Sequence, residues 1–176
     1  MKTLFKNIAI LTILLATITA CDEIEDLADV TKTVELTKQF KVELEGGDNA
    51  VETGSFNISI LTPAVEPYAD KLKNVAIEKI TFEVLNYTGD ALAEYKAQFT
   101  ADGTPFINES FFGFEADAND TIFEVNDTSA LNTVATKLLN NDSVTVSFNA
   151  ESTNLEVAAS FTIDVKFYIK VTANPL

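Results

Sequence analysis

One stretch near the C-terminus constrains the fold more than any other, because its side chains alternate between apolar and mostly polar over residues 157–172. The apolar row is Val157, Ala159, Phe161, Ile163, Val165, Phe167, Ile169 and Val171. A period of two places that row on one face of a β-strand, and a slip of one residue would turn all of it toward water. We therefore predict a central strand with one buried face. At ~3.4 Å per residue it would span about 50 Å, so we expect a bend or bulge within it.

The same alternation recurs along most of the chain. Further strands are predicted over residues 34–44, 55–62, 75–87, 91–101, 106–114, 121–125 and 144–150. The strands at 75–87 and 91–101 are separated by a short turn containing Gly89, which predicts a hairpin. In the strand at 106–114, alternation places Phe106, Phe112 and Phe114 on the core face and Phe111 on the opposite face.

Two short helices interrupt the strands. Residues 66–73 can form two helical turns with Pro67 near the start. A second helix is expected after Asp127 or Thr128, either of which can cap it. Its apolar stripe is Ala130, Leu131, Val134, Ala135, Leu138 and Leu139. Residues 115–120 are interpreted as an acidic loop. About eight half-buried strands favour an all-β antiparallel β-sandwich with two short helices, with an antiparallel β-barrel as the alternative.

The N-terminus has the layout of a secretion signal. Lys2 and Lys6 precede an apolar run, Ile8–Ile18, and small residues lead to Cys21. The run is shorter than the ~20 residues that a spanning helix needs. The tetrapeptide ending at Cys21, Ile-Thr-Ala-Cys, resembles the bacterial lipobox, although leucine is more usual where Ile18 stands. The resemblance implies cleavage before Cys21 and diacylation of its thiol.

This interpretation divides the chain into three parts. Residues 1–20 form the signal peptide, residues 21–32 the lipidated cysteine and an acidic tether, and residues 33–176 the β-sandwich domain. The acids behind Cys21 resemble the surface-export signals of Bacteroidota lipoproteins, which predicts an outer-membrane location facing the periplasm or the cell surface. In enterobacteria, an Asp after the cysteine instead resembles an inner-membrane retention signal.

The negative net charge of the chain argues against some classes of binding partner. The net charge is −15, all acids follow the signal, and the chain contains no arginine. Nucleic acid and anionic lipid headgroups both need clustered cations, so neither is expected as a partner. The membrane is expected to be reached through the lipid anchor, and the protein or glycan partner is unknown.

The residue inventory also argues against catalysis. There is no histidine, and the single cysteine is the lipid site, so the usual nucleophile systems are missing. We therefore predict a protein that is not an enzyme and has no cofactor; a carboxylate-based glycosidase is the enzymatic alternative. Asp117, Asn119 and Asp120 offer oxygen ligands of the kind Ca²⁺ takes, but they lack the EF-hand glycine and terminal glutamate, so no metal is assigned.

Three aromatic residues are candidates for a ligand site. Phe111, Tyr87 and Tyr168 fall off the core phase of their strands, where sugars could stack on them. Thr121 and Ser143 lie in Asp-Ser/Thr-aliphatic segments that resemble the O-glycosylation acceptor of Bacteroidota.

The sequence thus predicts a lipid-anchored cell-envelope lipoprotein acting as a non-enzymatic binding or structural module. A carbohydrate- or calcium-dependent surface recognition module is one alternative. A fimbrial-type subunit is another, although fimbrial precursors of this kind resemble substrates of an arginine-specific protease and this chain has no arginine.

Overall fold

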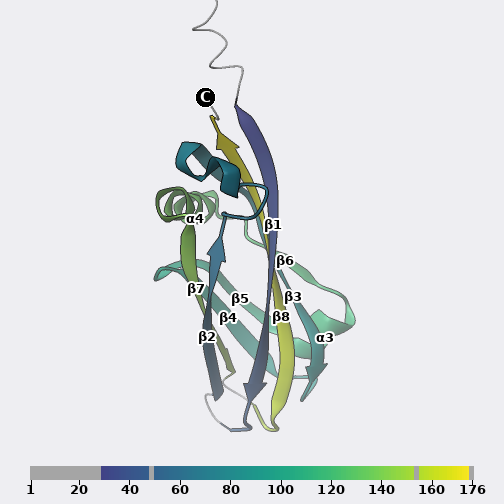
Figure 1. Cartoon of the computed structure of the whole chain (residues 1–176). Helices are drawn as coiled ribbons and strands as arrows, with labels where there is room; N and C mark the ends of the chain where they lie inside the picture. Colours follow the sequence, from purple (N-terminus) through teal and green to yellow (C-terminus); the bar gives the residue numbers. More distant parts are fainter. Residues whose placement is uncertain (1–28, 48–49, 153–154, 175–176) are drawn as a thin grey trace, which may run out of the picture.

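The computed structural model describes residues 29–47, 50–152 and 155–174, which form a sandwich of two antiparallel four-stranded sheets (Figure 1). Sheet 1 contains, in spatial order, β1 (Val30–Leu44), β8 (Ala159–Ala173), β3 (Leu72–Thr88) and β6 (Ile122–Glu124). Sheet 2 contains β2 (Ala50–Ser59), β7 (Ser143–Ser152), β4 (Glu94–Ala101) and β5 (Thr104–Phe112). The predicted antiparallel β-sandwich is confirmed, and the alternative of a closed barrel is wrong because the sheets remain separate.

The strand pairing is that of a jelly roll. β1 pairs with β8, β2 with β7, β3 with β6, and β4 with β5, all antiparallel. A chain paired in this way is one long hairpin, closed at the β4–β5 turn and rolled into two sheets. The turn residues Asp102 and Gly103 both have positive φ, 44° and 79°, which suits the tight connection of a twisted hairpin.

The predicted hairpin of residues 75–87 and 91–101 is wrong. These segments correspond to β3 and β4, which lie in different sheets, so the connection crosses the sandwich. Both strands have an apolar face, and each turns that face toward the core from its own side. Alternation indicates which face of a strand is buried, but it does not identify the strand's neighbour.

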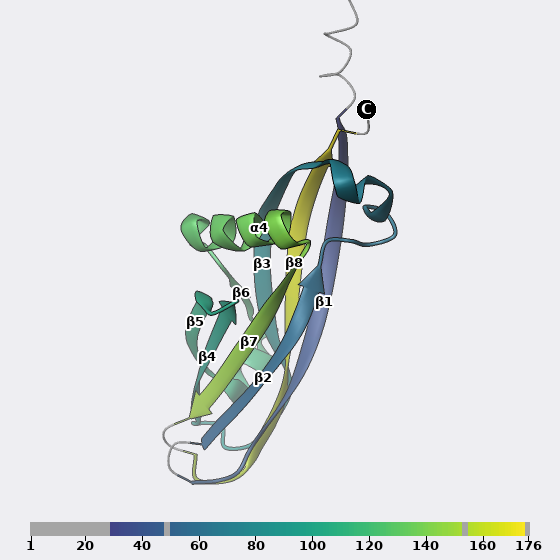
Figure 2. The same ribbon diagram turned by 60° about the vertical axis from the view of Figure 1, so that its left-hand side comes forward.

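β8 is the central strand that the sequence predicts. It lies between β1 and β3, and all its odd-numbered residues from Ala159 to Ala173 are buried. The strand starts two residues later than expected, since Val157 precedes it and is 52% exposed. β8 itself contains no bulge, although a bend or bulge was expected within it. Its register with β1 is unbroken, and the irregularities occur in β3, while the long strands twist over their whole length (Figure 2).

The helices lie at the ends and margin of the sandwich. The predicted turns at residues 66–73 form a 3-10 helix, η2 (Glu66–Lys71). The second predicted helix, expected after Asp127 or Thr128, is α4 (Thr128–Asn141). Asp127 caps α4, whose buried stripe packs against β3 and β7. The start of β1 and the end of β8 meet at one end of the sandwich, where Val30 pairs with Ala173 (Figure 1). β1 therefore includes residues 30–32, which were predicted to belong to the tether.

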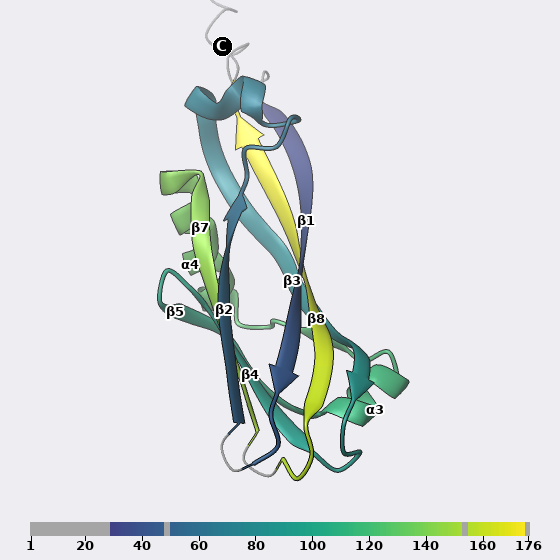
Figure 3. The same ribbon diagram turned by 60° about the horizontal axis from the view of Figure 1, so that its bottom comes forward.

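A further helix, α3 (Gly113–Ala118), replaces most of the predicted acidic loop at 115–120. It packs beside the C-terminal part of β3 (Figure 3). A β-carbon at position 113 would lie 2.3 Å from the ring of Tyr87, so only glycine permits this approach. The side chain of Ala116 is buried against the sandwich. Tertiary packing therefore stabilises a helix too short to be stable alone.

Candidate functional site

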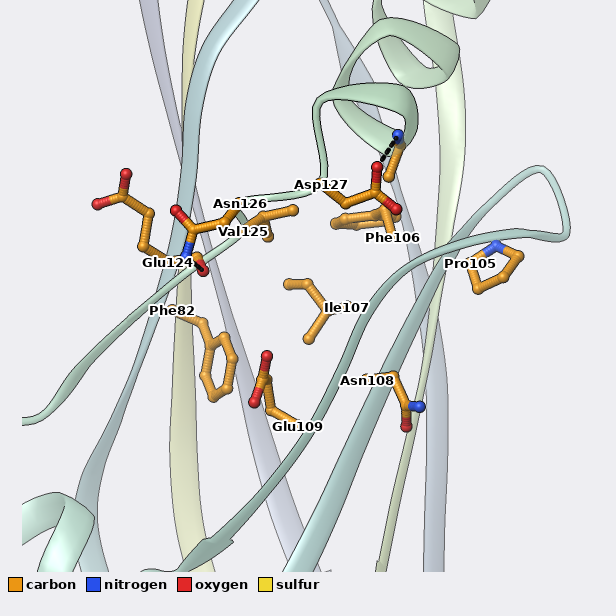
Figure 4. Close-up of a pocket in the computed structure, with 11 residues that line it drawn as sticks. Phe82, Pro105, Phe106, Ile107, Asn108, Glu109, Glu124, Val125, Asn126 and Asp127 are labelled. Atoms are coloured by element: carbon orange, nitrogen blue, oxygen red, sulfur yellow. Dashed lines mark hydrogen bonds between the residues drawn. The ribbon is translucent and has the colours of Figure 1, made fainter.

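A cleft of about 450 Å³ opens at the edge of the sandwich where β5 and β6 face each other (Figure 4). Its floor consists of apolar residues from both sheets and from α4: Phe82, Phe106, Ile107, Val125 and Ala130. Its rim consists of Pro105 and polar residues: Asn108, Glu109, Glu124, Asn126 and Asp127. We call this site the β5–β6 cleft. Its volume lies within the range of ligand pockets, roughly 300–1,000 Å³.

The cleft exists because the two edge strands differ in length. β5 runs from Thr104 to Phe112, whereas β6 pairs with β3 over only three residues, Thr81–Glu83. After β6 the chain leaves the sheet for the α4 cap. The sandwich therefore remains open beside the middle of β5, with core side chains at the bottom of the opening.

A bulge in β5 decides which side chains face the cleft. Thr100 pairs with Pro105 and Phe99 with Ile107, so Phe106 is an extra residue and the alternation shifts by one. Phe106 and Ile107 are both buried as a result. Beyond the bulge Ile107, Glu109 and Phe111 share the inner face, which places a charged side chain between two buried apolar ones.

The carboxylates of the rim differ in their partners. The carboxylate of Asp127 accepts hydrogen bonds from the backbone N–H groups of Ser129 and Ala130, at 2.8 and 3.2 Å. Glu124 pairs with Lys79 at 2.8 Å, and the hydrogen bond between them raises the pKa of Lys79 above 10.5. Glu109 has no hydrogen-bond or ion-pair partner among the described residues. The cleft therefore combines an apolar floor with one unpaired carboxylate, which suits recognition of a cation attached to an apolar group.

The three predicted ligand residues are not brought together. The prediction that Phe111 points away from the core is wrong, because the bulge at Phe106 turns it inward and leaves it 6% exposed. Tyr168 lies half-buried on the outer face of sheet 1, between Glu35 and Lys79. Tyr87 lies at the far end of β3. Phe112 and Phe114, expected in the core, are instead 43% and 52% exposed.

The hydroxyl of Tyr87 is engaged in hydrogen bonds within the protein, which indicates a structural role. This hydroxyl donates to the carbonyl oxygen of Asp90 at 2.6 Å and lies 2.9 Å from the hydroxyl of Tyr95. Burial raises the pKa of Tyr87 above 10, and burial together with the hydrogen bond to Tyr87 raises the pKa of Tyr95 further. The pair stays protonated at neutral pH and joins β3 to β4 across the sandwich.

The oxygen-rich segment at residues 117–120 also has local partners. The carboxylate of Asp117 accepts hydrogen bonds from the backbone N–H groups of Asn86 and Tyr87, at 3.0 and 2.9 Å. This contact holds the irregular end of β3, where Asn86 has a φ of 55°. Asn119 and Asp120 end α3 through backbone hydrogen bonds. Within the described residues, no group of three or more acidic side chains is placed to hold a metal ion.

The two candidate glycosylation residues occupy similar positions. Thr121 follows α3 and precedes β6, while Ser143 follows α4 and begins β7. In each case the preceding aspartate, Asp120 or Asp142, has a positive φ of 48° or 57°.

Cys21, the predicted lipidation site, lies outside the described residues. No helix in the described part of the chain is long and apolar enough to cross a membrane.

Sequence reasoning missed the residues that form the β5–β6 cleft. Asp127 and Ala130 were named only as parts of a helix, and Phe106 only as a core residue. The available signal was Glu109, a charge near the middle of a Phe-rich strand. Its significance depends on the bulge at Phe106 and on the shortness of β6, which local patterns do not reveal.

The fold and the cleft define a class: a jelly-roll β-sandwich with a ligand-sized opening at one edge. No family model matches the chain, and no curated protein matches it. Among solved structures, the decameric BFDV capsid protein is similar with a TM-score of 0.40 and 11% identity, covering 81% of this chain and 99% of that one. The Triatoma virus empty capsid is similar with a TM-score of 0.41 and 11% identity, covering 87% of this chain and 95% of that one. Turnip yellow mosaic virus is similar with a TM-score of 0.35 and 11% identity, covering 84% of this chain and 96% of that one. At these scores the likeness carries no information about function.

Proposed function

We propose that this chain is a lipid-anchored protein of the bacterial cell envelope whose jelly-roll domain is a non-enzymatic binding or structural module. Support for the anchor comes from the signal-like N-terminus that ends in Cys21. Residues 22–29 would reach roughly 25–30 Å when extended, enough to hold the domain clear of a lipid surface. Two or more acyl chains at Cys21 would make the attachment durable.

The observation that carries the binding role is the β5–β6 cleft. A sandwich serving only as a spacer has no need to leave Phe82, Phe106 and Ile107 beneath an opening of this size. Apolar surface with a few convergent polar groups is the usual composition of a binding site. The outer-membrane location is part of the proposal and rests on the acidic residues after Cys21.

The anchor is tested by the intact mass of the protein purified from membranes. We expect a chain that starts at Cys21 with added acyl mass, and Cys21→Ala should abolish the added mass. An unmodified chain that starts elsewhere would refute the anchor. Protease treatment of intact cells, with and without Ala in place of the acids at residues 22–29, tests the location.

The binding role is tested by photo-crosslinking in the intact envelope. A photoreactive residue at Asn126, on the rim of the cleft, should give a discrete adduct. The matched control is Ser55, which is exposed on the outer face of sheet 2. Equal labelling from both positions, or none from Asn126, would refute a binding role for the cleft.

A carbohydrate-recognition module is the second candidate, and one observation favours it. The outer face of sheet 2 is rich in uncharged amides and hydroxyls, including the hydrogen-bonded pairs Gln98–Asn108 and Thr145–Asn57. Binding of soluble glycans that is weakened by Gln98→Ala would support this candidate. No binding across a glycan array would eliminate it.

A further inference from the structure

β5 offers an unused strand edge along the cleft. One side of β5 pairs with β4, and as the last strand of sheet 2 it has no strand partner on its other side among the described residues. The backbone N–H and C=O groups on that side can pair with an added strand. The apolar floor lies directly beside this edge (Figure 4). An extended peptide could therefore gain backbone hydrogen bonds and a side-chain pocket together, which is the combination used in β-strand addition.

The carboxylate of Glu109 would make the cleft favour a positively charged ligand. Glu109 lies in the strand between Ile107 and Phe111, which are both buried, and its carboxylate has no partner among the described residues. Figure 4 shows Glu109 beside Phe82 and Ile107 at the opening. Glu109 is itself exposed, so an ion pair formed with it would be screened by water and salt and would contribute modestly to binding.

We propose that the β5–β6 cleft binds an extended peptide segment that adds to β5, placing a lysine or arginine against Glu109 and an apolar side chain over the floor. The proposal rests on the binding role above and names the chemistry of the partner. Charge argues against two other occupants. The chain's own segment at residues 22–32 is strongly acidic, and a second copy of β5 would bring another Glu109 to the same edge. Like charges on paired strands are destabilising.

A different role for Glu109 makes an opposite prediction. Inward-facing charges on edge strands also prevent sheets from joining edge to edge. If that were the only role of Glu109, neutralising it would promote self-association and no peptide would bind. Glu52 is the matched control, because it is an inner-face glutamate on β2, the opposite edge strand of the same sheet.

The test uses the full protein purified from membranes in detergent and fluorescent synthetic peptides, with binding followed by anisotropy. The probe is a short peptide of alternating lysine and valine. A glutamate–valine analogue and a peptide of residues 22–33 serve as comparisons. We expect the lysine–valine peptide to bind best. Glu109→Gln should weaken it about fivefold, near the upper limit for an exposed ion pair. Glu109→Lys should abolish the preference for lysine, and Glu52→Gln should change nothing.

Hydrogen exchange measured by mass spectrometry locates the peptide. Binding should protect the amides of residues 104–112, and circular dichroism verifies that each variant is folded. The proposal is overturned by absent binding, by protection elsewhere, by equal effects of Glu109→Gln and Glu52→Gln, or by stronger binding of the peptide of residues 22–33. Crosslinks from Asn126 without lysine–valine binding would remove the cationic partner while the binding role stands.

Discussion

Phe167 is the residue whose loss should most directly test the central role of β8. Its side chain is 0% exposed, and its ring lies 6.4 Å from that of Phe56 and 6.2 Å from that of Phe106, both on sheet 2. Phe167→Ala removes a ring that connects the two sheets and leaves a cavity. Changes of this type cost ~3–5 kcal/mol. A domain has ~5–15 kcal/mol of stability in total, so the loss is a large fraction of it.

Urea unfolding of residues 30–176, followed by circular dichroism, measures this loss. The midpoint should fall while the slope with urea stays constant, because the folded state buries a similar surface. For a domain of this size, the midpoint of thermal unfolding should fall by roughly 6–20 °C.

Phe112→Ala is the matched control, because it removes the same atoms from a side chain that is 43% exposed at the end of β5. It should cost less than about 1 kcal/mol. Phe167→Leu, which keeps much of the volume, should cost about 1.5 kcal/mol or less. Similar small losses for both alanine variants would falsify the placement of β8 at the centre of the core.

Other perturbations test the parts around the cleft. Asp127→Ala removes the cap of α4 and should cost about 0.5–2 kcal/mol in urea unfolding, whereas Asp127→Ser should restore most of it. Asp117→Ala leaves two backbone N–H groups at the end of β3 without their acceptor and should cost about 1–3 kcal/mol, with faster hydrogen exchange there. Burial raises the pKa of Tyr87 and Tyr95 above 10, so their contribution to stability is complete below pH 10 and is lost as the pH rises through the folded-state pKa values. Absorbance at 295 nm should show that these two tyrosines ionise at a higher pH in the folded domain than in the unfolded chain. Unchanged unfolding midpoints between pH 9 and pH 12 would contradict this loss of stability. Cys21→Ala should leave the unfolding midpoint unchanged while releasing the chain from membranes, because Cys21 precedes the first strand of the core.

Most individual strands could be predicted from the sequence because burial of one face imposes a period of two. The alternation that ends at Val171 predicted β8, and the stripe from Ala130 to Leu138 predicted α4. The order of the strands could not be predicted in the same way. β1 and β8 are neighbours although they lie at opposite ends of the described chain, and local alternation is the same whichever partner a strand takes.

The errors have a common physical cause, which is tertiary contact overriding local pattern. α3 packs closely against Tyr87 because position 113 is a glycine, the only residue for which there is room. Asp117 then holds the helix in place by accepting hydrogen bonds from the backbone of β3. Phe111 faces inward because a bulge five residues earlier shifts the alternation. Each case depends on a residue from a distant part of the chain or on a single extra residue in a strand. Neither is visible in a window of local sequence.

The edge strands bear both on the protection of the sandwich from self-association and on the proposed binding site. β1 has Lys38 in its inner-face row, and β2 has Glu52. Charges in such positions hinder edge-to-edge joining of sheets. β6 achieves the same result by being short, but its shortness leaves β5 beside an opening with an apolar floor. Glu109 is therefore an edge charge that lies at the proposed peptide site. The same carboxylate that repels another copy of this acidic chain would attract a cationic strand, so protection from self-association and selection of a partner would follow from one residue.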